Sequence, residues 1–241
     1  MSRTAAIVPA AGRGERLGPG APKALRTLGG VPMLVHAVRA LASARAVDLV
    51  VVAAPDDAVA EVSALLLEHG LADAEGGRAG AMVVAGGDTR QDSVARALHA
   101  LPPDYDVVLV HDAARPLVPV TLVDAVAAAV RGGADAVVPG LPVADTVKAV
   151  DAADVVSATL DRAQLRAIQT PQGFRRAALT EAHAASDPDA PATDDAGLVE
   201  RLGGKVVVVP GDEEAFKVTR PLDLLLAEAV LARRRAAGVV S

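Results

Sequence analysis

Short apolar runs alternate with longer amphipathic segments along most of the chain. Apolar runs, many of them rich in valine, stand at 5–10, 47–54, 81–87 and 105–112. Segments with apolar residues at helical spacing stand at 31–44, 57–70, 91–101 and 120–133. Strands with β-branched residues at nearly every position are typical of a parallel sheet that is buried on both faces. The pattern therefore predicts an α/β fold with a doubly wound, mostly parallel sheet.

The alternation breaks at one place. Residues 143–160 read as two short strands around an Asp-rich turn, with no helix between them. A hairpin outside the strand–helix pattern can serve as an arm that packs on a second subunit. We therefore expect a protruding β-arm at about 141–162 that is used in dimerisation. The α/β pattern then resumes, and because no linker long enough to divide two domains is found, residues 1–241 are expected to form one domain.

Composition narrows the possible partners and location. The formal net charge is −6, and the chain has two Phe, one Tyr and no Trp. A nucleic-acid polymer is therefore not an expected partner, because both a basic surface and stacking platforms are lacking. No apolar run approaches the length of roughly 20 residues needed to cross a bilayer, and no signal peptide or cysteine is found. A cytoplasmic location is expected.

The loop after the first predicted strand, "PAAGRGERLGPGAPKAL" at 9–25, is rich in glycine and cations. It does not complete a dinucleotide fingerprint, because Leu17 stands where the third glycine is required, and no Walker A sequence occurs in the chain. Backbone amides together with Arg16 and Lys23 would suit a polyphosphate. A solvated strand-to-helix loop explains the spacing equally well.

Two later loops also follow predicted strands. "GGDTRQDS" at 86–93 would let the backbone approach a flat ligand, but taken alone it is better explained as a plain strand-to-helix turn capped by Asp88. "HDAARP" at 111–116 places Asp112 at the end of a buried strand, where a carboxylate could serve Mg²⁺ beside a triphosphate. His111 could serve acid–base chemistry, but a histidine without a second histidine or other ligand spacing is more often structural, and no catalytic role is assigned to it.

No metalloprotease, serine-hydrolase or paired-cysteine motif is present. The remaining chemistry consists of cations, backbone amides and one or two carboxylates. That set suits phosphoryl or nucleotidyl transfer, in which positioning and charge stabilisation supply most of the catalysis.

An ordered set of motifs resembles one enzyme family. The stretches "PAAGRGERLGPGAPKAL", "GGDTRQDSV", "VHDAARP", "DTVK", "TLDRAQL", "QTPQGF", "TDDAGLVE" and "FKVTRPLDL" are similar, in this order, to motifs of 2-C-methyl-D-erythritol 4-phosphate cytidylyltransferases. The resemblance runs from about Ala5 to Leu226. It implies a Rossmann-like nucleotidyltransferase fold and a homodimer that joins CTP to the sugar-alcohol phosphate, with Mg²⁺ or another divalent cation as helper and with release of pyrophosphate.

The resemblance also assigns roles to residues. It implies a nucleotide pocket formed by Pro9, Ala10, Ala11, Gly12, Gly14, Gly87, Asp88, Ser93, Asp112 and Ala113. Arg16 and Lys23 would stabilise the charge on the triphosphate, and Asp112 would also be a metal ligand, directly or through water. The acceptor would be held by Asp112, Arg115, Thr146, Arg162, Thr170 and Lys217. Arg162, counted with Arg16, Lys23 and Lys217 among the catalytic groups, would reach the site from the arm of the other subunit.

Some readings stay open. A ribitol-5-phosphate cytidylyltransferase shares the fold and the CTP loop, and a non-catalytic nucleotide-binding protein is a further alternative. Thr193 is read as a helix cap with any substrate role secondary. Ala215 stands where many relatives have Asn, which leaves the hydrogen bonding before Lys217 open. Arg13 has no assigned role.

Overall fold

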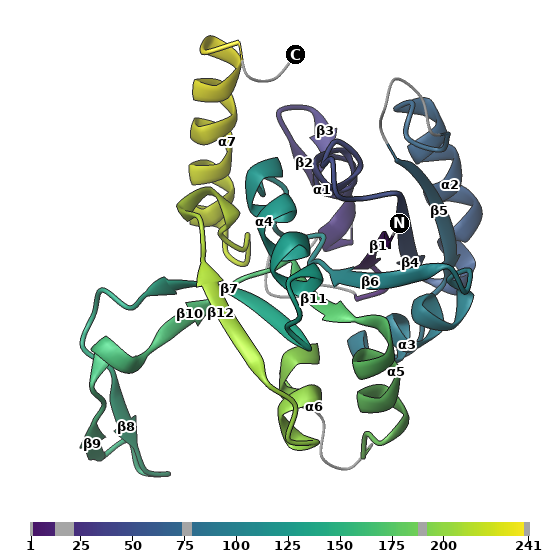
Figure 1. Cartoon of the computed structure of the whole chain (residues 1–241). Helices are drawn as coiled ribbons and strands as arrows, with labels where there is room; N and C mark the ends of the chain where they lie inside the picture. The colour runs from purple at the N-terminus through teal and green to yellow at the C-terminus, as the bar shows by residue number, and fades with distance from the viewer. Residues whose placement is uncertain (1, 13–21, 74–78, 188–191, 239–241) are drawn as a thin grey trace.

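A computed structural model describes residues 2–12, 22–73, 79–187 and 192–238. In this part of the chain, an eight-stranded sheet has the order β10-β7-β11-β6-β1-β4-β5, with β12 also paired to β7 (Figure 1). The strands are β1 (Arg3–Pro9), β4 (Leu49–Ala54), β5 (Gly80–Ala85), β6 (Tyr105–Val110), β7 (Ala136–Pro142), β10 (Arg166–Ile168), β11 (Gln172–Arg175) and β12 (Val206–Pro210). The helices are α1 (Met33–Ala42), α2 (Val59–Glu68), α3 (Arg90–Ala100), α4 (Val120–Arg131), α5 (Arg176–Ala184), α6 (Asp195–Arg201) and α7 (Pro221–Ala236).

Helices cover both faces of the sheet. Along β1, Ala6 and Val8 face a core to which α1, α2 and α4 contribute, whereas Ala5 and Ile7 face a second core with α3, α5 and α6. Successive side chains of a strand point to opposite faces, so a strand buried on both sides needs apolar residues at every position. The prediction of a doubly wound, mostly parallel sheet is therefore confirmed.

The strand order reverses beside β1. β4 and β5 follow one another in parallel on one side of β1, and after α3 the chain crosses back so that β6 pairs in parallel on the other side. In open α/β sheets, ligands bind at such a switch point, outside the carboxyl ends of the strands. The loops after β1, β5 and β6 therefore meet at the position where a ligand is expected.

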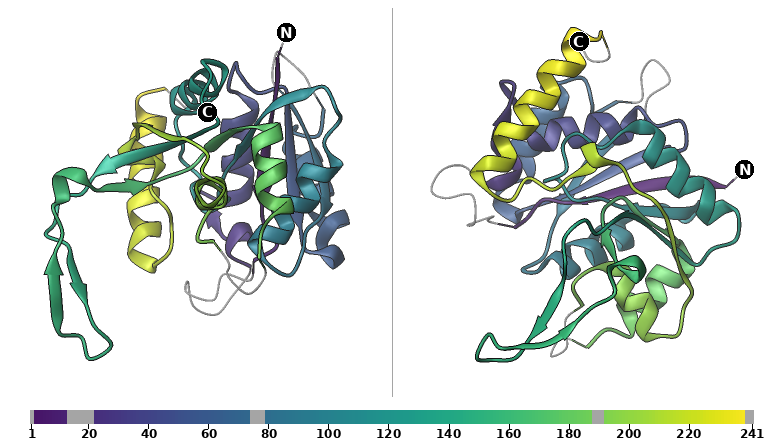
Figure 2. Two further views of the ribbon diagram at one scale, coloured as in Figure 1. Left: turned by 60° about the horizontal axis from the view of Figure 1, so that its bottom comes forward. Right: turned by 90° about the vertical axis from the view of Figure 1, so that its left-hand side faces the viewer.

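Two strands run against this direction. β11 is antiparallel to both β6 and β7, and β10 is antiparallel to β7. Between β7 and β10 the chain leaves the body of the protein as a long arm (Figures 1 and 2). The arm contains β8 (Lys148–Val150) and β9 (Val156–Thr159), which form the expected antiparallel hairpin. Its use in dimerisation stays a prediction.

Helix α7 packs outside the main layers, near the small β2–β3 hairpin (Thr27–Leu28 and Val31–Pro32). Leu28, Leu117 and Leu231 belong to the apolar cluster beneath it. None of the helices in the described ranges is both long and apolar enough to cross a membrane.

Two expected caps lie one residue away from their predicted positions. Helix α3 is capped by Thr89 rather than Asp88, because the Asp92 amide donates to Thr89 Oγ1 at 3.0 Å and the Thr89 amide donates back to the Asp92 carboxylate. Helix α6 is capped by Asp194 rather than Thr193, since the Gly197 amide donates to Asp194 Oδ1. In both cases the extended backbone of the capping residue directs its side chain over the first turn.

Candidate active site

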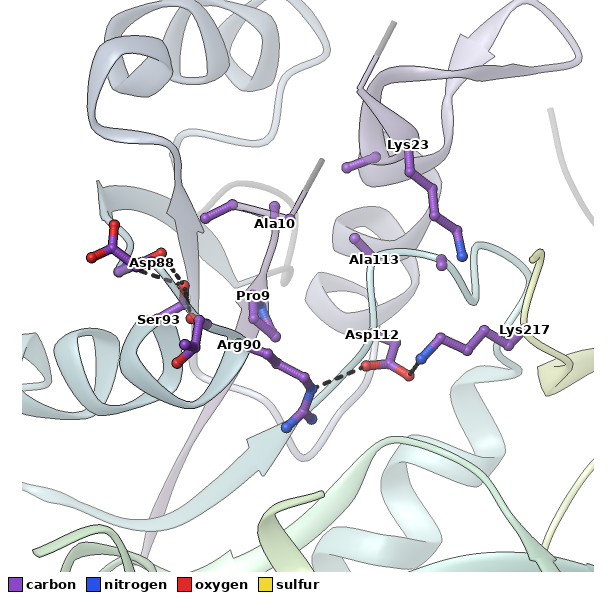
Figure 3. Close-up of a pocket in the computed structure, with 15 residues that line it drawn as sticks. Pro9, Ala10, Lys23, Asp88, Arg90, Ser93, Asp112, Ala113 and Lys217 are labelled. Atoms are coloured by element: carbon purple, nitrogen blue, oxygen red, sulfur yellow. Dashed lines mark hydrogen bonds and ion pairs between the residues drawn. The ribbon is translucent and has the colours of Figure 1, made fainter. Parts of the chain in front are cut away.

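A pocket lies where the loops after β1, β5 and β6 converge (Figure 3). Lys23 and Lys217 enter it from segments far apart in the sequence. The full lining consists of Pro9, Ala10, Ala11, Gly12, Lys23, Ala24, Gly87, Asp88, Thr89, Arg90, Ser93, Asp112, Ala113, Ala114 and Lys217. The structure thus brings together most of the residues expected to hold a nucleotide.

The small residues let two of these loops approach closely. A Cβ atom at Gly86 would lie 2.9 Å from Ala11 Cβ, and one at Gly87 would lie 2.2 Å from Asp92 Cβ. The Gly87 amide donates to Ser93 Oγ at 3.1 Å, which ties the β5 loop to the first turn of α3. No side chain larger than hydrogen fits these two positions without a shift of the backbone. The result is a backbone-lined wall with space for a flat group beside it.

Asp112 is the electrostatic centre of the pocket. Lys217 Nζ lies 2.8 Å from Asp112 Oδ2, Arg115 Nε lies 3.6 Å from the same oxygen, and Arg90 Nε lies 3.5 Å from Oδ1. Burial opposes ionisation of this carboxyl group, but the charges of Lys217 and Arg90 outweigh it and hold the pKa of Asp112 well below its usual range. Asp112 is therefore ionised, and the three positive side chains around it carry more charge than its single negative charge balances.

A buried relay fixes the backbone of this loop. His111 Nε2 lies 3.2 Å from the Arg115 carbonyl oxygen, so the hydrogen-bond pattern assigns the ring hydrogen to Nε2. Nδ1 then accepts from the Thr170 hydroxyl at 3.0 Å, and Thr170 Oγ1 accepts from the Asp112 amide, also at 3.0 Å. Burial lowers the pKa of His111 to about 4, so the ring is neutral at physiological pH.

Arg115 is held largely by the backbone. Its Nη1 donates to the Ala215 carbonyl at 2.7 Å and its Nη2 donates to the Ile168 carbonyl at 3.3 Å. Its Nε is buried and has no hydrogen-bond partner among the described residues, and burial lowers the pKa of the side chain. Ala215 stands where many relatives have asparagine, but its contact with Arg115 is made by the backbone carbonyl. Because every residue has this carbonyl, position 215 supports the site without an asparagine side chain.

Arg90 lines the pocket but was not among the predicted site residues. Its Nη1 donates to Asp195 Oδ2 at 2.7 Å, and its Nε faces Asp112. Arg90 is the first residue of α3, where the helix macrodipole disfavours a positive charge. That mismatch within "GGDTRQDS" is the sequence signal that could have identified it.

Several predicted residues lie elsewhere. Thr146 is exposed on the arm, and Arg162, in a 3-10 turn at Arg162–Gln164, donates to the Ala144 carbonyl within the same arm. Neither lines the pocket of its own chain. Arg16, Gly14 and Arg13 lie outside the described residues.

The donor set bears on a metal ion. The described residues hold no group of three or more His, Cys, Asp or Glu side chains that could bind a metal. Mg²⁺ commonly uses one or two carboxylates, with waters and substrate phosphates completing its shell. Asp112, as a single carboxylate, therefore fits a metal ion whose other ligands are chiefly phosphate oxygens of the substrate.

The sheet is doubly wound, and the pocket at its switch point is lined by glycines, lysines and one carboxylate bound by cations. These features define the class of α/β proteins that bind nucleotides and act on them. The described residues that line the pocket provide backbone amides and cations but no nucleophile–base pair, which suits transfer between phosphates. The chain belongs to the 2-C-methyl-D-erythritol 4-phosphate cytidylyltransferase family, whose sequence model matches residues 4–233.

Individual relatives agree with this assignment. The 2-C-methyl-D-erythritol 4-phosphate cytidylyltransferase of Streptomyces coelicolor is 65% identical over 97% of this chain and 87% of its own length. The one from Frankia casuarinae is 60% identical over 96% of this chain and 82% of its own. The crystal structure of the Thermus thermophilus enzyme of that name is 40% identical, with a TM-score of 0.74 over 97% of this chain and all of that one. The 4-diphosphocytidyl-2C-methyl-D-erythritol synthase of Anaerococcus prevotii has a TM-score of 0.80 at 28% identity, covering 96% and 99% of the two chains.

Proposed function

We propose that this protein transfers the cytidylyl group of CTP to 2-C-methyl-D-erythritol 4-phosphate, forming 4-diphosphocytidyl-2-C-methyl-D-erythritol and pyrophosphate for isoprenoid precursor synthesis. The observation that carries the proposal is the Asp112 cluster at the switch point, with Lys217 and Arg90 on its two oxygens. Family membership over residues 4–233 supports the choice of substrates. We infer that residues 1–241 act as one cytidylyltransferase domain.

The reaction needs cations more than it needs a base. An oxygen of the acceptor phosphate forms a bond to the α-phosphorus of CTP, and the bond from that phosphorus to the bridging oxygen of pyrophosphate breaks. A phosphate monoester has a second pKa near ~6, so its nucleophilic oxygen is largely deprotonated at neutral pH. Negative charge builds on the α-phosphate and on the departing pyrophosphate, where fixed cations stabilise it.

We assign the nucleotide to the walls formed by the loops after β1 and β5. The expected contacts are Pro9, Ala10, Ala11, Gly12, Gly87, Asp88 and Ser93, with Ala113 beside the ribose. Lys23, with Arg16 and Gly14 of the same loop, would hold the triphosphate. A backbone carbonyl near Ala10 or Gly87 would accept from the cytosine amino group and favour CTP over UTP.

We assign the acceptor phosphate to Lys217 beside Asp112. Arg115 and Thr170, whose donors are held by backbone carbonyls and by His111, would support the Asp112 loop rather than touch the phosphate. Two anions repel each other, so cations must hold the acceptor in line with the α-phosphorus. Arg162 and Thr146 would come from the arm of a second copy, since on their own arm they lie outside the pocket. Val150, Val155, Val156 and Leu160 of the arm are exposed, and burial of such apolar side chains would favour a homodimer.

A divalent cation, Mg²⁺ or a similar ion, completes the proposed site. Asp112 would hold it directly or through water, together with oxygens of the triphosphate. When bound, such an ion would neutralise phosphate charge.

Pyrophosphate release tests the proposal. Purified protein should release pyrophosphate rapidly with CTP and methylerythritol phosphate, and slowly when UTP replaces CTP. Activity with ribitol 5-phosphate alone would move the assignment to that neighbouring activity. Release with neither acceptor would support a non-catalytic nucleotide-binding protein.

A further inference from the structure

The motif at 193–200, which the proposed function leaves without a role, contributes a buried carboxylate close to the pocket. Asp195 is the first residue of α6 and is 1% exposed. It is not the helix cap, because that contact is made by Asp194. A carboxylate is costly to bury unless cations or hydrogen-bond donors satisfy it. The partners of Asp195 therefore indicate what this residue does.

Each oxygen of Asp195 has its own partner. Arg90 Nη1 donates to Oδ2 at 2.7 Å, and His183 Nε2 lies 3.0 Å from Oδ1. His183 comes from α5, and its side chain is only 5% exposed. Burial opposes ionisation, but the His183 hydrogen bond and the charge of Arg90 outweigh it and keep the pKa of Asp195 below its ordinary value. A fixed negative charge therefore lies beside Arg90.

Arg90 connects this charge to the site. Its guanidinium lies between two carboxylates, because Nη1 contacts Asp195 and Nε faces Asp112 Oδ1. Figure 3 shows the second of these contacts, with Arg90 and Lys217 on the two oxygens of Asp112. The planar guanidinium has donors on separate edges, so one arginine can engage both carboxylates in a defined orientation. Without Asp195, Arg90 could turn both donors of one edge onto Asp112 and draw that carboxylate away from Lys217.

We propose that Asp195 is a positioning residue, which holds Arg90 so that Arg90 fixes Asp112 from the side away from Lys217. The inference rests on the proposed function, because its effect is expected in the half of the site that binds the acceptor phosphate. His183 acts one contact further out, by holding the second oxygen of Asp195. Motif 193–200 thereby acquires a role in the reaction without touching a substrate.

Asp195→Asn tests this role because it keeps the shape of the side chain and removes its charge. We expect the KM for methylerythritol phosphate to rise about tenfold, with kcat and the KM for CTP within about twofold of wild type. Asp194→Asn is the matched control: it makes the same change one position earlier on the same helix, at a residue that contacts Gly197 and Gln172. It should leave both KM values unchanged even if it lowers the Tm.

A double-mutant cycle separates positioning from general damage. Arg90→Lys keeps the positive charge but loses the planar guanidinium with its several donors, and it should raise the KM for methylerythritol phosphate about tenfold. Adding Asp195→Asn to Arg90→Lys should then change this KM by less than about twofold. Should Asp195→Asn prove too unstable to purify, Arg90→Lys alone carries the test. A wild-type acceptor KM in Asp195→Asn or Arg90→Lys, an equal rise in Asp194→Asn, or additive effects would overturn the inference. An inactive wild-type protein would instead refute the proposed function.

Discussion

Lys217 Nζ lies 2.8 Å from Asp112 Oδ2, although the two residues come from distant loops. The lysine is partly exposed toward the pocket, whereas the carboxylate is nearly buried. A cation held at this point is oriented before substrate arrives, and an incoming phosphate dianion can attract it without a large rearrangement. This pairing is the physical basis of the first prediction.

Lys217→Ala should slow the chemical step by about 10²- to 10³-fold, because a cation that orients and stabilises phosphate charge is lost. CTP binding, measured by calorimetry, should remain close to wild type. Lys23→Ala should instead chiefly lower the affinity for CTP. Lys205→Ala, an exposed lysine next to β12, is the control and should match wild type. Equal loss of CTP affinity in Lys217→Ala and Lys23→Ala would contradict the division of the site.

Two glycine variants separate folding from nucleotide binding. Gly87→Ala places a methyl group 2.2 Å from Asp92 Cβ, so the loop must move and the Tm should fall. A Cβ at Gly12 meets no atom of the described residues within 4 Å, so Gly12→Ala should keep the wild-type Tm. We nevertheless expect it to weaken CTP binding by about tenfold or more, because the new methyl group would enter space assigned to the nucleotide. Unchanged CTP affinity in Gly12→Ala would show that the nucleotide lies elsewhere.

His111 should make stability depend on pH. Burial lowers its pKa from 6.5 to about 4, so between these values the unfolded chain binds a proton that the folded protein does not. The free energy of unfolding should therefore fall with falling pH through this window, by about 3 kcal/mol in total from this group. Urea unfolding of wild type and His111→Asn should show the stability advantage of the histidine shrinking toward about pH 4.

The exposed His99 on α3 provides the matched control, and His99→Asn should keep the wild-type pH dependence. Parallel curves for wild type and His111→Asn would mean that His111 is not buried in its neutral form.

Subunit mixing tests whether the arm completes a neighbouring site. The Arg162→Ala and Lys217→Ala variants should each be nearly inactive on their own. In the proposed dimer with crossed arms, a heterodimer would have one site with an intact Lys217 from one chain and an intact Arg162 from the other. Activity should therefore reappear after the two variants are unfolded and refolded together. Tagged, purified heterodimers without recovered activity would place Arg162 in the site of its own chain.

The sequence predicted the parallel part of the fold well, because a strand such as β1 needs an apolar side chain at every position to fill two cores. The antiparallel direction of β11 was not predicted, since four residues, Gln172–Arg175, carry no signal for the direction of pairing. The sequence predicted helix caps at Asp88 and Thr193, whereas Thr89 and Asp194 make the capping contacts. In both places a Thr and an Asp are adjacent, and the backbone conformation determines which side chain lies over the first turn.

The candidate site was predicted chiefly through the ordered motifs. Asp112 and Lys217 were expected near one another, and the structure pairs them. The link from Arg90 to Asp195 was missed, because 105 residues separate the two and neither spacing nor composition reports such a contact. Arg162 and Thr146 remain predictions that depend on a second copy.

The most direct test of the central claim is a side-by-side measurement of kcat/KM for methylerythritol phosphate and ribitol 5-phosphate with CTP, with the product identified by mass spectrometry. We predict efficient formation of 4-diphosphocytidyl-2-C-methyl-D-erythritol, and a value for ribitol 5-phosphate lower by about two orders of magnitude or more. Equal or higher efficiency with ribitol 5-phosphate, or no cytidylylated product from methylerythritol phosphate, would contradict it.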